Sequence, residues 1–142
     1  MPLEFERSIL GEEFDRTEHE PVTADELIAF ARALGETAPC YVEAGAGLIG
    51  HPTYCIRFRG RKFFPDNLPE RLRTRMSFDA GKDIEFGVPI RVGDVLTATS
   101  TVHDIYEKTG RSGTMAFVVL RTTVTNQRNE RVAIIDQKMM FR

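Results

Sequence analysis

The side chains most able to carry chemistry lie in and after the stretch ALGETAPCYV, residues 33–42. Glu36 supplies a carboxylate, Tyr41 a phenol, and His51 an imidazole ten positions later. General acid–base catalysis needs such groups aimed at one substrate atom or one water. An imidazole titrates near pH ~6.5, whereas a phenol titrates near ~10 and stays protonated at neutral pH. Each residue also has a structural interpretation, which we favour: a solvated carboxylate for Glu36 and a packing role for Tyr41 and His51.

A second candidate is the basic segment RFRGRKFFPDNLPERLRTR, residues 57–75. Seven basic residues stand there against Asp66 and Glu70, a local charge of +5 in a chain of net charge −2. Arginine suits phosphate through its planar fork, although a solvated charged loop is the commoner fate of such a run. The candidate substrate-binding residues are Arg57, Arg59, Arg61, Lys62, Pro52 and Thr53.

The glycines Gly45, Gly47 and Gly50 spell GxGxxG, the pattern of a dinucleotide-binding loop. That pattern has a mechanism only between a strand and a helix of a βαβ unit. Here a helix and a loop precede it, and no βαβ alternation follows. We therefore interpret residues 43–51 as a loop that leads into a short helix at PTYCIRF, with Pro52 at its first position.

The loop that carries Glu36 and Tyr41 follows directly after one clear helix near the start of the chain. Thr23 is a typical N-cap, Glu26 is its capping-box partner, and apolar residues follow at helical spacing. Gly35 then provides a left-handed stop. The preceding stretch GEEFDRTEHEPV is too polar for a central strand and indicates an edge strand or an extended arm.

The second half of the sequence predicts strands. MSFDAGKDIEFGVPI indicates one strand that bends near Ala80 and Gly81. A turn at RVGD opens a strand through TATSTVHDIYE, and the loop KTGRSG leads into TMAFVVLRTTVTN, with burial on both faces in mid-strand. The short QRNE turn precedes the last strand, RVAIIDQKMMFR. Because parallel strands need a crossover of about a dozen residues, strands 114–125 and 131–141 should form a hairpin in the middle of the sheet. The helix at 24–34 should lie outside the central one.

Composition excludes several classes of function. A chain of 142 residues fits one domain, and its 28% charged and 42% hydrophobic residues are ordinary for a globular protein. The slight negative charge argues against nucleic-acid binding. No apolar run reaches the ~18 residues of a membrane span, and the start MPLEFERSIL lacks the features of a signal peptide. We expect a cytoplasmic location, with Cys40 and Cys55 as free thiols. We expect His19 and His103 to lie on exposed strands without partners.

Three stretches together resemble one family over nearly the whole chain. They are the helix end AFARALGETAPCYVE, the loop GLIGHPTY, and the strand–turn–strand AGKDIEFGVPIRVGDVLTATSTVHDIYEKTGRSG. They are similar to the hotdog-fold MaoC-like (R)-specific enoyl-CoA hydratases and 3-hydroxyacyl-thioester dehydratases, and more narrowly to the non-catalytic class. The resemblance implies an α+β hotdog fold over residues 1–142, an antiparallel sheet wrapped around a central helix, with subunits paired side by side.

Active members of that family carry Gly-Asp-x-Asn-Pro-x-His, in which the Asp and His activate one water for addition to an enoyl thioester. The pattern falls on residues 35–41 of this chain. Gly35 and Pro39 match, Glu36 keeps a carboxylate with one more methylene, Ala38 lacks the amide, and Tyr41 replaces the histidine. A misplacement of order 1 Å can cost about a hundredfold in rate, so independent catalysis is not expected.

The resemblance therefore implies a non-catalytic subunit of an acyl-CoA or acyl-carrier hydratase/dehydratase in fatty acid metabolism. Its partner would be a second hotdog subunit that supplies Asp and His, in a dimer or a dimer of dimers, with no cofactor and no metal. Phe58, Phe63 and Phe64 could line an acyl tunnel or pack at a subunit interface. Two alternatives stay open. One is a self-sufficient homodimeric hydratase or thioesterase that uses Glu36, and the other is an acyl-CoA-binding module.

Overall fold

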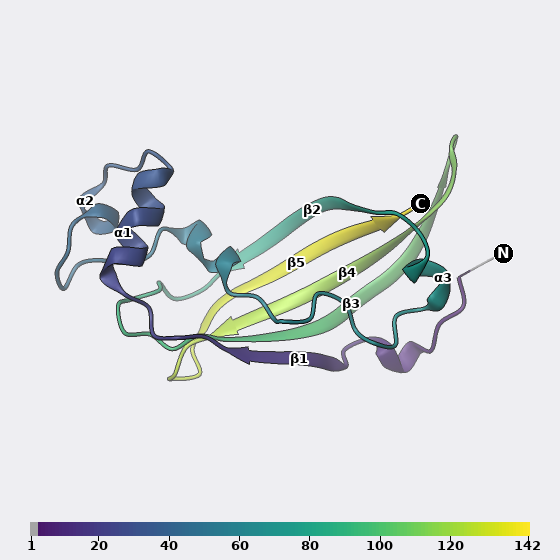
Figure 1. Ribbon diagram of the computed structural model, residues 1–142, viewed down its shortest axis with the longest axis horizontal. Helices are drawn as coiled ribbons and strands as arrows, with labels where there is room; N and C mark the ends of the chain where they lie inside the picture. Colours follow the sequence, from purple (N-terminus) through teal and green to yellow (C-terminus); the bar gives the residue numbers. More distant parts are fainter. Residues whose placement is uncertain (1–2) are drawn as a thin grey trace.

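The C-terminal half of the chain forms long strands because its β-branched and aromatic residues suit a pleated, half-buried surface. In the computed structural model, which describes residues 3–142, these strands and one N-terminal strand build a five-stranded antiparallel sheet (Figure 1). The strands are β1 Glu13–Glu18, β2 Ser77–Phe86, β3 Thr97–Gly110, β4 Gly113–Thr125 and β5 Arg131–Phe141. Their order across the sheet is β1-β3-β4-β5-β2. The hairpin predicted from QRNE is confirmed, with β4 the middle strand.

The helices are short and lie outside the sheet. They are α1 Ala24–Ala33, α2 Pro39–Val42 and α3 Glu70–Arg73, with 3₁₀ helices η1 Arg7–Ile9 and η2 Pro52–Arg57. The predicted capping box of α1 is present, because the side chains of Thr23 and Glu26 each bind the other's backbone N–H. Figure 1 shows α1 and α2 beyond one end of the sheet. Within residues 3–142, no helix is long and apolar enough to cross a membrane.

Strand β2 forms one edge of the sheet and is irregular at the predicted position. Its pairing with β5 slips between Asp79 and Lys82, and Gly81 takes a φ of +117° there. Nine of its ten residues are exposed to solvent. A long edge strand with free backbone groups on its outer side is a surface on which another strand can pair.

The inner face of the sheet is crossed by residues 52–73, which we call the crossing segment (Figure 1). It consists of η2, an extended stretch, and the single turn of α3. Gly60, Pro65 and Pro69 explain why no long helix forms, since proline removes a helical hydrogen bond and glycine favours the unfolded chain. The antiparallel hotdog sheet is thus confirmed, and its central element is a six-residue 3₁₀ helix followed by extended chain.

Apolar side chains fill the inner face in two separate clusters. The first surrounds η2 and includes Leu27, Tyr54, Phe58 and Ile135. The second lies under α3 and includes Leu72, Val118 and Phe141. The extended part of the crossing segment spans the region between the two clusters.

Side chains of β1 and of the residue that follows it hold the extended part in place. Asp15 Oδ2 accepts a hydrogen bond from the backbone N–H of Arg61 at 2.8 Å and from the hydroxyl of Thr17 at 3.0 Å. His19 Nε2 donates to the carbonyl of Arg59 at 3.0 Å, and its ring meets Phe58 edge-on. The expectation that His19 and His103 lack partners is therefore wrong. His103 also has one, because Arg121 donates to its Nε2 at 3.2 Å.

Gly60 is required by this close approach. A Cβ at position 60 would collide with Asp15 Oδ2 and come within 2.9 Å of Ser100 Oγ. We predict that Gly60→Ala lowers the free energy of unfolding by about 1–3 kcal/mol, the usual cost of overpacking, as measured by urea denaturation.

Gly47→Ala is the matched control, because a Cβ there meets no atom within 4 Å and the residue does not need a positive φ. The Asp15→Ala background should reduce the cost of Gly60→Ala, since it removes the carboxylate that the new methyl group would strike. Equal effects of the two glycine substitutions would contradict the close approach of Gly60 to Asp15 described above.

Candidate functional site

The loop after α1 is built by backbone hydrogen bonds that position Glu36. Gly35 has a φ of +78° and donates to the carbonyl of Arg32, while the N–H of Glu36 returns to the carbonyl of Ala31. This is the glycine-based helix stop that the sequence predicts. Pro39 then starts α2. The carboxylate of Glu36 turns back onto the loop and accepts from the backbone N–H groups of Thr37 at 3.0 Å and Ala38 at 3.2 Å.

The structure brings the three candidate acid–base residues together. His51 Nε2 lies 3.7 Å from Glu36 Oε2, and the rings of His51 and Tyr41 have centroids 5.2 Å apart. The side chains of His51 and Glu36 are only 21% and 29% exposed. The backbone N–H of Ile49 donates to the carbonyl of Cys40 and so joins the two parts of the loop that carry these residues.

The second ring nitrogen of His51 is held by Thr53. Nδ1 accepts from the backbone N–H of Thr53 at 3.3 Å and lies 2.8 Å from its hydroxyl oxygen. Because Nδ1 accepts, a neutral His51 carries its proton on Nε2, which faces Glu36. The separation of 3.7 Å is longer than a hydrogen bond, so the pair is an ion-pair contact when the imidazole is charged. Thr53, a candidate substrate-binding residue, thus orients His51 in this structure.

An apolar hollow of about 110 Å³ adjoins His51. It lies between the start of η2 and the chain that follows β2, with lining residues that include Cys55, Phe86 and Val132. Pro52, the other candidate at the start of η2, also lines it. A carboxylate, an imidazole and an apolar hollow are therefore neighbours at this end of the molecule, although Glu36 does not itself line the hollow.

The four basic candidates differ in how far they are already engaged. Arg57 donates to the hydroxyl of Tyr54 at 3.1 Å and lies 3.9 Å from Glu26. Lys62 pairs with Asp66 at 2.7 Å, and this hydrogen bond holds the pKa of the Asp66 carboxyl below its usual value. Within residues 3–142, the guanidinium groups of Arg59 and Arg61 have no ion-pair or hydrogen-bond partner.

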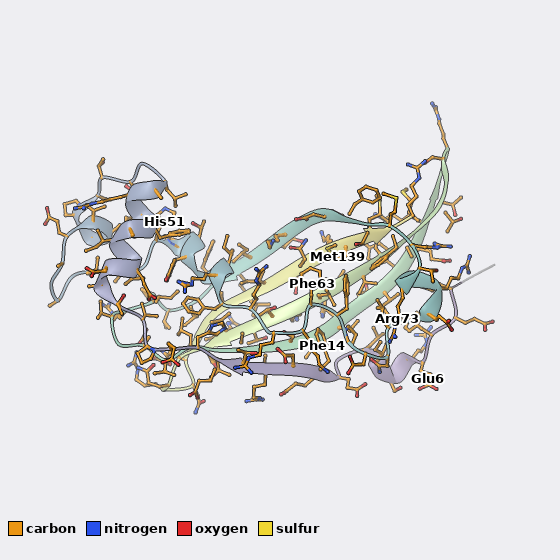
Figure 2. All side chains as sticks on the ribbon, in the orientation of Figure 1. Glu6, Phe14, His51, Phe63, Arg73 and Met139 are labelled. Atoms are coloured by element: carbon orange, nitrogen blue, oxygen red, sulfur yellow. The ribbon has the colours of Figure 1, made fainter. Side chains whose placement is uncertain are left out.

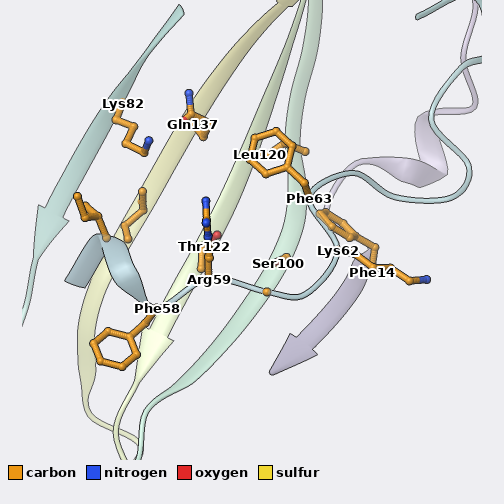
Figure 3. A pocket seen from close by; sticks show the side chains of 13 residues that line it. Phe14, Phe58, Arg59, Lys62, Phe63, Lys82, Ser100, Leu120, Thr122 and Gln137 are labelled. Atoms are coloured by element: carbon orange, nitrogen blue, oxygen red, sulfur yellow. The ribbon is translucent and has the colours of Figure 1, made fainter. Parts of the chain in front are cut away.

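A cavity of about 80 Å³ lies between the crossing segment and the middle of the inner face (Figure 3). Phe58, Phe63, Arg59 and Lys62 line it from the crossing segment. Phe64 instead packs on Phe141, with ring centroids 5.7 Å apart, and belongs to the core. Phe58 and Phe63 therefore line this cavity, and Phe58 is at the same time part of the first core cluster.

The acid–base residues and this cavity occupy different parts of the molecule. In Figure 2, His51 lies at the helical end, whereas Phe14 and Phe63, which line the cavity, lie at the sheet. Helix η2 links the two regions, since it starts directly after His51 and ends at Arg57, one residue before Phe58.

The glycine pattern at residues 45–50 serves neither region as a nucleotide loop. The sheet contains no parallel strand pairs among its named strands, so no βαβ unit surrounds the pattern. Gly50 instead packs against Ile90 and Leu27, where a Cβ would come within 3.1 Å of the Cβ of Ile90.

Residues 8–135 match the family model described as the FAS1-like, dehydratase domain region. The chain belongs to this dehydratase family. It is 24% identical to a UPF0336 protein of Streptomyces coelicolor, over 99% of this chain and 97% of that protein.

Two solved structures have folds similar to that of this chain. A MaoC-like dehydratase from Rhodospirillum rubrum shares 26% identity, with a TM-score of 0.64 over 93% of this chain and 91% of the other. The HadBC (3R)-hydroxyacyl-ACP dehydratase complex from Mycobacterium tuberculosis has a TM-score of 0.65 at 20% identity, over 93% and 96% of the two chains. The chain is thus a hotdog-fold, MaoC-like member of the hydratase/dehydratase family.

The two cysteines provide a test of the loop geometry. Both thiols are free, as expected, with Cys40 exposed in α2 and Cys55 buried in η2, where burial raises the pKa of its thiol. Because the thiolate is the reactive form, iodoacetamide should label Cys40 and spare Cys55 in the native protein, as read by mass spectrometry.

The Cys40→Ser variant should then remain unlabelled until urea unfolds it, at which point Cys55 reacts. Rapid native labelling of Cys55 would show that η2 does not pack against the sheet as described.

Proposed function

We propose that this chain is a non-catalytic hotdog subunit of an acyl-CoA or acyl-carrier hydratase/dehydratase. The observation that carries the proposal is the state of the loop at residues 35–41. One oxygen of its carboxylate, on Glu36, accepts from the N–H groups of Thr37 and Ala38, and Tyr41 stands where active relatives have histidine. A catalytic partner subunit would supply the Asp and His.

The cavity over the sheet supports a role in substrate binding. A full helix across the inner face would fill the space that the extended crossing segment leaves open. The cavity of about 80 Å³ beside Phe58 and Phe63 would receive the far end of an acyl group whose thioester sits in the partner's active site. A subunit that no longer holds its own reaction geometry is free to widen this space for large acyl groups.

A second candidate function has one specific observation in its favour. The Glu36–His51 contact at 3.7 Å, beside an apolar hollow, is the kind of carboxylate–imidazole pair that performs acid–base chemistry. A self-sufficient hydratase or thioesterase would use this pair in place of the family's Asp and His.

Activity assays separate the two candidates. The isolated chain should not hydrate crotonyl-CoA, and it should gain activity only when reconstituted with a hotdog subunit of its own organism that retains Asp and His. In that complex, Glu36→Ala should leave the rate nearly unchanged, whereas loss of the partner's Asp or His should abolish it.

Turnover of an acyl-CoA by the isolated chain would contradict the proposal that this subunit is non-catalytic. It would support the second candidate if Glu36→Ala and His51→Gln each lowered the rate by the ~10² to 10⁴ typical of a lost general base. The triple variant Glu36→Asp, Ala38→Asn, Tyr41→His tests whether the backbone of the loop still has the geometry that catalysis needs. Hydratase activity in this variant would show that only the catalytic side chains have been replaced.

Edge strand β2 is the proposed pairing surface for the partner subunit. Phe78 and Phe86 on this strand are 41% and 52% exposed, and the neighbouring Met76 is 69% exposed. The opposite edge, β1, is shorter and carries the exposed ion pair of Glu13 and Arg16. Strand pairing along β2 would cover both its apolar side chains and its free backbone groups. HadBC is itself a complex, which supports a hotdog partner.

We therefore predict that the protein sediments as a dimer, alone or with a partner, at micromolar concentration. The double variant Phe78→Lys, Phe86→Lys should shift it toward monomer, because it places charge on the edge. Val92→Lys is the control, since Val92 is 49% exposed and lies in a turn outside β2. A wild-type protein that sediments only as monomer would contradict the prediction.

A further inference from the structure

Polar side chains from four strands form a line across the floor of the cavity, interrupted between β4 and β5 by Leu120 and Ile135. Ser100 of β3, Thr122 of β4, Gln137 of β5 and Lys82 of β2 all line it (Figure 3). The register explains the line, because Ser100 lies opposite Thr122 and Gln137 lies opposite Lys82 on neighbouring strands. Directly opposite residues on one face of an antiparallel pair bring their side chains within contact distance.

Hydroxyl groups in this floor are free to bind a ligand. Ser100 is only 5% exposed, yet within residues 3–142 neither its hydroxyl nor that of Thr122 makes a hydrogen bond. Removing a hydroxyl group from water without giving it a new hydrogen-bond partner costs free energy. A purely hydrocarbon ligand over these groups would impose that loss, whereas a ligand with oxygen atoms at its end would replace the water.

Three basic side chains line the same space, and one of them, Lys62, is already paired with Asp66. Arg59 reaches it from the crossing segment and Lys82 from β2, and within the described residues neither is within ion-pair distance of a carboxylate. Two carboxylates lie near the cavity without lining it, and one of them, Asp79, is close enough to Lys82 to interact with it electrostatically. Asp79 Oδ1 accepts from the amide of Gln137 and from the N–H of Gly81, both at 2.8 Å. Asp15 Oδ2 accepts from the backbone N–H of Arg61. The charged side chains that line the cavity itself are therefore all basic.

From this arrangement we infer that the cavity selects an acyl group whose far end carries a carboxylate. Arg59 and Lys82 would pair with the charge, and the hydroxyls of Ser100 and Thr122 would donate to the carboxylate oxygens. The volume of about 80 Å³ suits a terminal group rather than a whole chain, since one water needs roughly 10–15 Å³. The inference rests on the proposed role of this cavity in holding the end of an acyl thioester.

The phosphates of the carrier are the other source of an anion for Arg59. Arg59 lines the same cavity as the hydroxyl groups of Ser100 and Thr122. These hydroxyl groups lie on the inner face of the sheet, where they would contact the end of an acyl group rather than a phosphate at the protein surface. We therefore favour the acyl end as the anion that Arg59 binds. The probes must therefore carry the acyl group without phosphate.

Binding of three N-acetylcysteamine thioesters to the full chain, in the oligomeric state in which it purifies, tests the inference by calorimetry. The three probes have equal chain length and end in a methyl, a hydroxyl or a carboxylate group, and the comparison is repeated over a series of lengths. The carboxylate-ended probe should bind about tenfold or more tightly than the methyl-ended one, the scale of a hydrogen bond to a charged group.

Arg59→Gln and Lys82→Gln should each remove most of this preference, and Thr122→Val should reduce it without changing the side-chain volume. Lys138→Gln is the matched control. It makes the same change of charge beside Gln137 on β5, but on the opposite face of the strand, where Lys138 pairs with Asp83 at 2.9 Å. The preference should survive in this control.

The remaining outcomes separate this inference from the proposed function. Equal or tighter binding of the methyl- or hydroxyl-ended probe overturns the inference and leaves the acyl pocket in place. Failure of all three probes to bind overturns both. A preference that persists in Arg59→Gln and Lys82→Gln, or displacement of the carboxylate-ended probe by free coenzyme A in an Arg59-dependent way, also overturns the inference.

Discussion

An extended segment that crosses a sheet carries backbone groups that neither a helix nor a strand pairs, and such groups are costly to bury unsatisfied. Two hydrogen bonds solve this problem here: the carboxylate of Asp15 accepts from the backbone N–H of Arg61, and His19 donates to the carbonyl of Arg59. The rest of the inner face depends on them. They fix the height of the crossing segment above the strands, and this height determines the size of the cavity and the direction in which Arg59 enters it.

The local parts of the fold could be predicted because each rests on a few adjacent residues. Thr23 and Glu26 form the capping box, Gly35 stops the helix, and the QRNE turn is too short for anything but a hairpin. The path of the crossing segment is harder to predict from the sequence. Pro52 marks its start in the sequence, but the hydrogen bonds that hold it join residues at least 40 positions apart, and no spacing rule relates Asp15 to Arg61.

The same distinction applies to the candidate site. The loss of histidine at position 41 is visible in the sequence, whereas the approach of His51 to Glu36 depends on how two loop segments meet in space. His51 was interpreted as a packing residue, and Thr53 as a substrate contact, because nothing in the chain order shows that one orients the other. Likewise, the polar line beneath the crossing segment becomes visible only once the register aligns Ser100 with Thr122 and Gln137 with Lys82.

The order of the strands also has a consequence for biosynthesis. The first two strands to leave the ribosome, β1 and β2, are the two edges of the sheet, and each pairs with a strand made later. The partner of β2 is β5, the last strand of the sheet, so the surface on which η2 packs is incomplete until β5 has been made. During translation the N-terminal half must therefore remain unpaired, and the β3–β4–β5 meander, whose contacts are local, is the natural place for the sheet to begin.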